Sequence, residues 1–246
     1  MGLNTLGFMV QMIPYLFVSY RLIQKWPFEE GISWKTHSVA KRYKAGLEAF
    51  RLDKALQSPI VCANLELCKQ ISLEKPVLLD FGCANGLYKI LLANHTHTKE
   101  WIYVGADINP DLVEFCRAAY PNTRFEVSTS LFGDDEFDLT LASGVIQYIE
   151  NWGNILKELK RVTKKFIMIT RLPVWEYHES AIALQNVWYR GRREQHPLII
   201  LNRSEMQAEF ARIGCTLSFE HCGGGSFRLP GVPETVVHSN FLFEVK

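Results

Sequence analysis

Apolar and polar positions follow two alternating patterns from Val77 onward. Short apolar runs typical of buried strands lie at residues 76–82, 101–107, 123–129, 137–144 and 165–171. Between some of these runs, residues 112–120 and 152–162 repeat apolar side chains every three or four positions, which predicts amphipathic helices. Strands that alternate with helices favour parallel βαβ units with right-handed crossovers.

The C-terminal part of the chain extends this arrangement. Residues 203–214 predict a helix closed by Gly214, and residues 216–221 and 236–245 predict an antiparallel pair of strands at the edge of the sheet. The predicted fold class is therefore α/β, with a doubly wound, mostly parallel, seven-stranded sheet. Ligands of such sheets bind outside the carboxyl ends of the strands.

The N-terminal part has a different pattern. Residues 38–57 and 61–71 predict two helices. We therefore expect a helical N-terminal extension over residues 1–72, followed by a domain over residues 73–246 that carries a long insertion at 173–202.

Residues 6–23 are apolar enough to raise the question of a membrane. Gln11, Pro14 and Ser19 interrupt the run, and it lacks the basic front and cleavage site of a secretory signal peptide. Three arrangements stay open: a helix packed on the body or on a partner, a helix lying on a membrane surface, and a span, for which the run is marginal.

Composition and charge exclude several function classes. A net charge of +1, with 48% hydrophobic and 22% charged residues, is ordinary for a soluble protein and gives no general attraction to nucleic acid. The six cysteines form no C-x-x-C pair, so we expect neither a metal site nor a disulfide framework. These features predict reduced thiols in a cytoplasmic protein, and residues 6–23 are the candidate segment for a peripheral contact with a membrane.

The stretch "VLLDFGCANG", residues 77–86, carries the clearest chemical signal: an apolar strand ends in Asp80, and a loop of small residues follows. A nicotinamide dinucleotide requires G-x-G-x-x-G at such a loop. Here those positions hold Gly82, Ala84 and Leu87, and Asp80 would face a doubly negative pyrophosphate. S-adenosylmethionine fits better, because it has no phosphate and its sulfonium and ammonium groups attract a carboxylate.

The next predicted strand ends in a second acid, Asp107, in "YVGAD". A carboxylate at this point can accept hydrogen bonds from two ribose hydroxyls. Alone, Asp107 would equally suit the ribose of a nicotinamide cofactor or the start of a helix. The two acids on consecutive strands, with the loop between them, favour S-adenosylmethionine.

At these residues the chain resembles the class I S-adenosylmethionine-dependent methyltransferases, over roughly Pro76 to the C-terminus. "LLDFGCANG" is similar to the first motif of that superfamily, D-x-G-x-G-x-G, with Ala84 in place of the middle glycine, and "GADIN" is similar to its ribose-binding acid. A narrower resemblance is to a little-characterised family of bacterial methyltransferases associated with surface-polysaccharide gene clusters. It is carried by "FDLTLASGVIQYIENW", "ITRLPV", "LQNVW" and "ILNRSEM".

The resemblance implies a Rossmann-like methyltransferase fold and a set of cofactor contacts. By the superfamily's pattern, the residues that bind S-adenosylmethionine are Asp80, Gly82, Cys83, Ala84, Asn85, Gly86, Asp107, Ile108, Ser143, Gly144 and Gln147. The acid or amide that often binds adenine after the third strand is not evident.

Methyl transfer depends mainly on alignment of acceptor, methyl carbon and sulfur, and it needs a general base only when the acceptor must lose a proton. The candidate catalytic residues are Tyr148, Arg171 and His178, with Gln185 as a further candidate. Arg171 ends the fifth strand, where it suits either a carboxylate or phosphate of the acceptor or a structural ion pair. The insertion at 173–202 has the length and aromatic content of a lid or acceptor site.

The predicted function is S-adenosylmethionine-dependent O- or N-methylation of a small-molecule or saccharide-linked acceptor. Two alternatives stay open. One is a cofactor-binding accessory protein without catalysis, which docks through its apolar N-terminus. The other is a nicotinamide-dependent oxidoreductase, which Asp80 and Leu87 disfavour.

Overall fold

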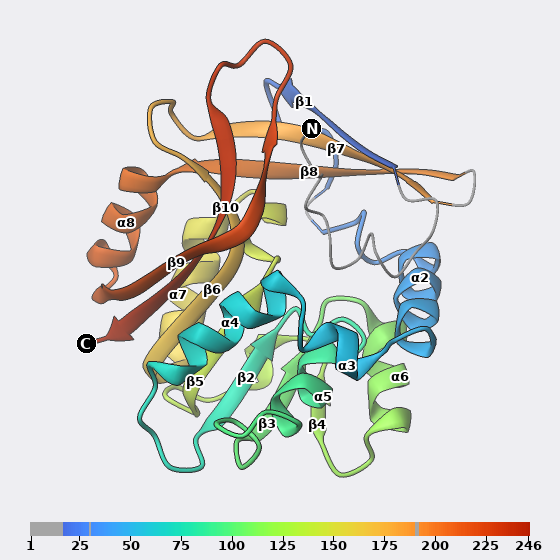
Figure 1. Cartoon of the computed structure of the whole chain (residues 1–246), viewed down its shortest axis with the longest axis vertical. Helices are drawn as coiled ribbons and strands as arrows, with labels where there is room; N and C mark the ends of the chain where they lie inside the picture. Colours follow the sequence, from blue (N-terminus) through green and yellow to red (C-terminus); the bar gives the residue numbers. More distant parts are fainter. Residues whose placement is uncertain (1–16, 30, 190–191) are drawn as a thin grey trace.

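The computed structural model describes residues 17–29, 31–189 and 192–246, whose strands form one mixed sheet (Figure 1). Ten strands lie within these residues: β1 (Phe17–Ile23), β2 (Val77–Phe81), β3 (Ile102–Ala106), β4 (Arg124–Glu126), β5 (Phe137–Ser143), β6 (Thr163–Trp175), β7 (Ala181–Tyr189), β8 (Arg192–Asn202), β9 (Cys215–Arg228) and β10 (Thr235–Val245). The helices there are α2 (His37–Glu48), α3 (Leu52–Ala55), α4 (Pro59–Lys69), α5 (Leu87–Ala93), α6 (Pro110–Ala119), α7 (Trp152–Val162) and α8 (Arg203–Arg212), with the single turns η1 (Thr129–Leu131) and η2 (Ile146–Tyr148).

The predicted α/β sheet is present, in the order β4–β3–β2–β5–β6–β10–β9. The first five of these strands are parallel, and β10 runs antiparallel to both β6 and β9. The predicted strand count is incomplete, because β1, β7 and β8 add an antiparallel sheet that joins the end of β6 through β8. The sheet is therefore mixed, and larger than the predicted seven strands.

Alternating side chains of the central strands pack on the two faces of the sheet. Leu78 of β2 and Met168 of β6 pack into a cluster with residues of α4, α5 and α6. Ile167 and Ile169, the neighbours of Met168, pack on the other face with residues of α7 and α8. Helices therefore cover both faces of the central sheet, as the predicted doubly wound arrangement requires.

The helix predicted over residues 6–23 is wrong for residues 17–23, which form β1; residues 1–16 lie outside the described part of the chain. All seven residues of β1 pair with β7, from Phe17 opposite Trp188 to Ile23 opposite Ile182. The partner strand is more than 150 residues away in the sequence, so no local pattern could indicate it. Among the helices in the described part of the chain, none combines the length and apolar character needed to cross a bilayer.

Two further predictions change in detail. The single helix expected over residues 38–57 is broken into α2 and α3, because Arg51 between them is extended, with φ of −122°. The insertion at 173–202 contains the β7–β8 hairpin, paired from Ala181–Ile200 to Tyr189–Arg192. The second predicted N-terminal helix is confirmed as α4.

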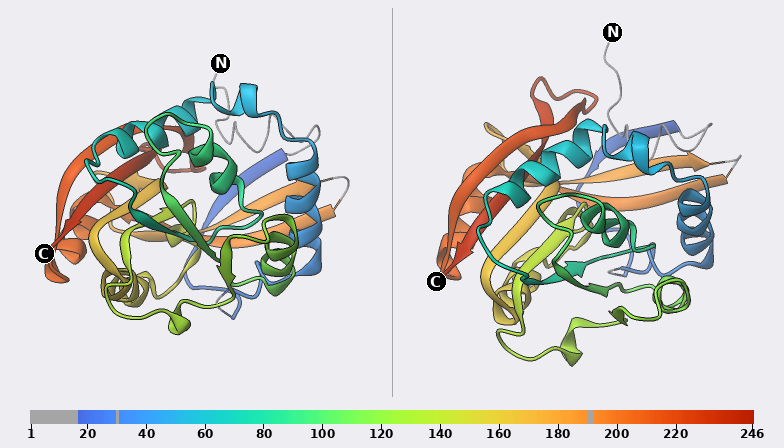
Figure 2. Two further views of the ribbon diagram at one scale, coloured as in Figure 1. Left: turned by 90° about the horizontal axis from the view of Figure 1, so that it is seen from below. Right: turned by 60° about the horizontal axis from the view of Figure 1, so that its bottom comes forward.

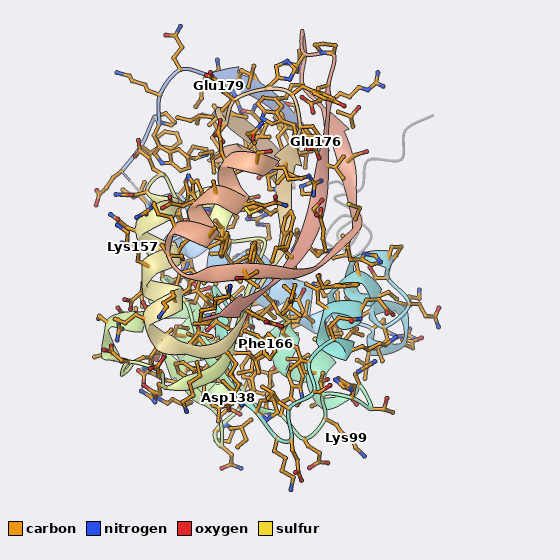
Figure 3. The ribbon with its side chains drawn as sticks, turned by 90° about the vertical axis from the view of Figure 1, so that its left-hand side faces the viewer. Lys99, Asp138, Lys157, Phe166, Glu176 and Glu179 are labelled. Carbon is orange, nitrogen blue, oxygen red and sulfur yellow. The ribbon has the colours of Figure 1, made fainter. Side chains whose placement is uncertain are left out.

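The added sheet lies near the carboxyl ends of the central strands. It crosses the top of Figure 1, and Figure 2 shows α2 beside the ends of β7 and β8 from two further directions. Figure 3 places Asp138, near the start of β5, at the opposite end of the molecule from Glu176 and Glu179, which follow β6. The carboxyl edge of the sheet, where ligands of this fold class bind, thus lies next to the added sheet.

Replacement of Gly105 in β3 should destabilise the protein. A Cβ on this residue would lie 2.5 Å from Cδ1 of Phe125 and 3.0 Å from Sγ of Cys83. We expect Gly105→Ala to lower the free energy of unfolding by about 1–3 kcal/mol, the scale of an overpacked core. Gly46→Ala in α2 is the matched control, because its Cβ meets nothing within 4 Å, and it should stabilise by about 0.5–1 kcal/mol. Urea unfolding of the two variants checks this; equal effects would contradict the packing described.

Candidate active site

The loop between β2 and α5 has three residues in the left-handed region of backbone conformation. Gly82, Ala84 and Gly86 have φ of +77°, +48° and +75°. The N–H groups of Gly82 and Cys83 both donate to the carbonyl of Ala106, at 2.7 and 3.0 Å, which holds the loop against the end of β3. Ala84 occupies a conformation that favours glycine and costs other residues roughly 1–2 kcal/mol.

Close neighbours fix the small residues of this loop. A Cβ on Gly82 would lie 2.4 Å from Cγ2 of Val145, and one on Gly86 would lie 2.8 Å from Cε2 of Tyr120. Asn85 is buried and its Nδ2 donates to the carbonyl of Tyr43 at 2.9 Å, which ties the loop to α2. The loop therefore places backbone close to the ends of β2 and β3, as close approach of a ligand requires.

Asp80, in β2, is 1% exposed. Its Oδ2 accepts a hydrogen bond from the Tyr103 hydroxyl at 2.5 Å. Burial raises the pKa of Asp80 to about 7, against the lowering effect of the Tyr103 hydrogen bond, and the nearby Asp107 raises it further. Without a cationic ligand, this carboxyl group holds its proton in part at neutral pH.

Asp107 follows β3 and joins two segments. Its Oδ2 accepts from the N–H of Ala84, and its Oδ1 accepts from the N–H of Asn109, both at 2.8 Å. Burial raises the pKa of Asp107, and these two hydrogen bonds lower it. A carboxylate offers about four acceptor positions, so capacity remains for two ribose hydroxyls.

The remaining predicted cofactor residues follow β3 and β5. Ile108 is 45% exposed, whereas Gln147 is 5% exposed and its Oε1 is buried without a hydrogen-bond partner among the described residues. The Ser143 hydroxyl lies 2.8 Å from the Tyr88 hydroxyl, and Gly144, with φ of +67°, donates to the Thr170 carbonyl at 2.9 Å. The structure thus distributes the predicted residues over the carboxyl ends of β2, β3 and β5.

Tyr148 and Gln185, two of the candidates from the sequence, are in contact. The Tyr148 hydroxyl donates to Oε1 of Gln185 at 3.1 Å, and Nε2 of Gln185 donates to the Tyr20 hydroxyl at 3.1 Å. Tyr20, Gln185 and His196 are cross-strand neighbours on β1, β7 and β8, so they share one face of the added sheet. Burial raises the pKa of Tyr148 to about 12, so this hydroxyl stays protonated at neutral pH.

An aromatic stack lies beside these residues. The ring of Trp34 stacks on His196, with centroids 4.3 Å apart, and lies 4.6 Å from the ring of Tyr148. His196 is 1% exposed, and burial lowers its pKa. Its neighbour Glu194 pairs with Arg42 at 3.0 Å. A sequence reading could not find Trp34 or His196, because only the pairing of distant strands brings them to Tyr148.

The structure separates the other two candidate catalytic residues. Arg171 lies in β6 with its guanidinium over Gly144. His178 instead has Nδ1 2.5 Å from Oε2 of Glu234 and its ring next to Trp175, and none of the interactions within the described residues joins it to Tyr148 or Arg171. His178 thus stands apart from the group that holds Tyr148.

The aromatic residues that follow β6 differ in exposure. Trp175 is 3% exposed and packs in a core cluster, and its Nε1 donates to the carbonyl of Glu179. Tyr177 is 88% exposed.

All six cysteines are free thiols, and four of them are buried, including Cys83 of the loop.

Comparison with known proteins places the loop and both acids in a recognised domain. Residues 79–166 match a family model described as a methyltransferase domain. A search of curated proteins found no match.

Many solved structures share the fold. A 1,6-didemethyltoxoflavin-N1-methyltransferase from Burkholderia thailandensis, with bound S-adenosylhomocysteine, is 12% identical over 92% of this chain and 95% of its own, with a TM-score of 0.55. A sugar N-methyltransferase from Streptoalloteichus is 10% identical over 92% of this chain and 98% of its own, with a TM-score of 0.57. An S-adenosylmethionine-dependent methyltransferase from Clostridium acetobutylicum is 11% identical over 85% of this chain and 98% of its own, with a TM-score of 0.57.

At these identities the likeness shows the fold, which is that of S-adenosylmethionine-dependent methyltransferases. The prediction of this fold is confirmed. The domain match and the bound cofactor product of the Burkholderia enzyme support S-adenosylmethionine as the cofactor.

The raised pKa of Asp80 predicts a pH-dependent stability. Between pH 4 and about 7 the unfolded chain releases the Asp80 proton while the folded protein keeps it, so the free energy of unfolding falls as pH rises. We expect wild type to lose stability relative to Asp80→Asn across this window, by at most about 1.4 kcal/mol per pH unit, and the difference to level off above it. Urea unfolding at pH 5, 6, 7 and 8 measures it. A difference that stays constant from pH 5 to 8 would contradict the raised pKa.

Proposed function

We propose that this protein is an S-adenosylmethionine-dependent methyltransferase that methylates oxygen or nitrogen of a small-molecule or saccharide-linked acceptor. The observation that carries the proposal is the arrangement of Asp80 and Asp107 at the ends of adjacent parallel strands, on either side of a left-handed loop of small residues. The match of residues 79–166 to a methyltransferase domain supports it.

The charges of this arrangement suit a cationic cofactor. Asp80 is buried and has no cationic partner among the ion pairs of the described residues, so a sulfonium or ammonium would favour its ionised form. A dinucleotide would instead bring its pyrophosphate to Asp80. Leu87, which begins α5, also puts a large side chain where the dinucleotide motif has its third glycine.

We assign the cofactor roles by position in this arrangement. Asp80 and the loop residues Gly82, Cys83, Ala84, Asn85 and Gly86 hold the methionine part. Asp107 and Ile108 hold ribose and adenine. Ser143, Gly144 and Gln147 border the sulfonium, and the unpartnered Oε1 of Gln147 is a free acceptor beside it.

S-adenosylmethionine supplies a methyl group on a cationic sulfur, which leaves as a neutral thioether. The residues of the chain then have to orient the acceptor, which contributes much of the rate of such a displacement. Tyr148 keeps its proton at neutral pH and is held by Gln185, so we propose that it positions the acceptor by hydrogen bonding and is not the base. This arrangement suits an amine that arrives neutral better than a hydroxyl that needs a strong base.

The acceptor class rests on resemblance. The narrower sequence resemblance is to bacterial methyltransferases associated with surface polysaccharides, and one fold neighbour is a sugar N-methyltransferase. We propose residues 73–246 as the catalytic domain, residues 1–72 as its extension, and a cytoplasmic location, which the six free thiols favour.

Calorimetric titration with S-adenosylhomocysteine, and with NADH in parallel, tests the cofactor. We expect micromolar binding of S-adenosylhomocysteine and none of NADH. Asp107→Ala should weaken binding at least about tenfold, because it removes charged hydrogen bonds to ribose. Asp107→Asn retains an oxygen acceptor, so its affinity for S-adenosylhomocysteine should lie between those of wild type and Asp107→Ala.

Asp138→Ala is the matched control. Asp138 likewise accepts a backbone hydrogen bond, from the N–H of Val77 at 2.8 Å, but at the opposite end of the sheet (Figure 3). Its loss should leave S-adenosylhomocysteine affinity unchanged. Equal weakening by Asp107→Ala and Asp138→Ala would remove Asp107 from the cofactor site. Binding of neither S-adenosylhomocysteine nor NADH would contradict the proposed cofactor site.

A further inference from the structure

A β-bulge changes the direction of Arg171. Two residues of β6, Thr170 and Arg171, oppose the single residue Asn240 of β10. Arg171 has φ of +60°, a conformation that is costly for a residue with a long side chain, and its N–H donates to Oδ1 of Asn240 at 2.8 Å. Bulges beside active sites commonly re-aim a side chain in this way.

The re-aimed guanidinium lies at the carboxyl end of β5. A Cβ on Gly144 would lie 3.2 Å from Nη1 and 3.3 Å from Cζ of Arg171. Gly144 directly follows Ser143, so the guanidinium borders the segment that we assign to the sulfonium. Arg171 is therefore next to the place where an acceptor would receive the methyl group.

The guanidinium of Arg171 has no ion-pair partner within the part of the chain that the structure describes. Among the described residues, no carboxylate oxygen lies within 4.0 Å of its guanidinium. The titratable side chains that its charge affects come from five elements: Tyr20, Tyr43, Tyr88, Tyr148 and His238. Burial raises the pKa of each tyrosine and, as the main cause, lowers that of His238 to about 4, so all five are uncharged at neutral pH.

Arg42 provides the contrast within the same region. It is 5% exposed and also affects Tyr43 and Tyr148, but its Nη2 lies 3.0 Å from Oε2 of Glu194. Within the described residues, Arg42 thus forms an ion pair, whereas the partly buried Arg171 forms none. An anion that reached the guanidinium of Arg171 would form charge-assisted hydrogen bonds that no described carboxylate already makes.

We infer that the methyl acceptor carries a carboxylate and that Arg171 binds it. This rests on the proposed function, because the acceptor is defined by that reaction. The planar guanidinium matches a carboxylate through two parallel N–H···O bonds, and its single charge balances a monoanion better than a dianionic phosphate.

The Nε–Hε signals of arginine in nuclear magnetic resonance spectra test this, in protein saturated with S-adenosylhomocysteine. The probe is sodium acetate, with sodium chloride at equal ionic strength as the blank. Loss of a signal in Arg171→Gln assigns Arg171, and Arg171→Lys serves if that variant does not fold. We expect the Arg171 signal to shift and saturate at an acetate concentration at least tenfold lower than that of Arg193.

Arg193 and Arg42 are the internal controls. Arg193 is exposed and donates to Oδ1 of Asn186, so its signal should not saturate in the range of acetate concentration that saturates Arg171. The signal of Arg42 should not shift, because Arg42 already forms an ion pair with Glu194. Equal responses of Arg171 and Arg193 would overturn the inference. Tighter binding of inorganic phosphate than of acetate would overturn the choice of a carboxylate.

Failure of the proposed function gives a different result. If the protein does not bind S-adenosylhomocysteine, the proposal that S-adenosylmethionine is its cofactor is wrong. The same acetate titration without S-adenosylhomocysteine still reports whether Arg171 is an anion site, so the two ideas fail separately.

Discussion

The carboxylate of Asp107 is the interaction on which the rest of the candidate site depends. One oxygen holds the loop after β2 through the N–H of Ala84, and the other holds the start of α6 through the N–H of Asn109. Ala84 has an unfavourable φ of +48°, and the hydrogen bond to Asp107 offsets part of that cost. Because the carboxylate has acceptor capacity left, the group that organises the loop can also hold ribose. If Asp107 binds ribose as proposed, the structure of the loop and the affinity for the cofactor are coupled through this one side chain.

The second constraint is the pairing of β1, β7 and β8, which brings distant residues over the carboxyl edge of the sheet. Tyr20 and Gln185 lie 165 positions apart in the sequence and are joined by a hydrogen bond. Gln185 in turn accepts from Tyr148, which follows β5. The proposed acceptor side is thus assembled from an N-terminal strand, the β7–β8 hairpin and the central sheet, whereas the residues proposed for the cofactor all lie between positions 80 and 147.

This difference explains how much the sequence could predict. The central strands, α4, α6, α7 and α8 follow from local periodicity, and the loop with Asp80 and Asp107 follows from a contiguous motif. The strand β1 could not be predicted, because an apolar run such as "FVSYRLI" suits a strand or a helix until its partner is known. The same holds for Trp34 and His196, whose contact depends on where β8 lies. His178 was proposed from its residue type and position in a loop, and its pairing with Glu234 depends on long-range structure.

The charges at the two sides of the site are opposite, and this links the two ligands. Asp80 and Asp107 lie on the cofactor side without cationic partners in the described residues, and Arg171 lies on the other side of Gly144 without a carboxylate. A cofactor with a positive sulfur is attracted by the acids and repelled by the arginine. A carboxylate on the acceptor would cancel that repulsion, so each ligand should strengthen the binding of the other. A neutral acceptor would leave the positive charge of Arg171 beside the sulfonium. An acceptor with a carboxylate therefore suits this arginine, which has no ion pair among the described residues, better than a neutral acceptor does.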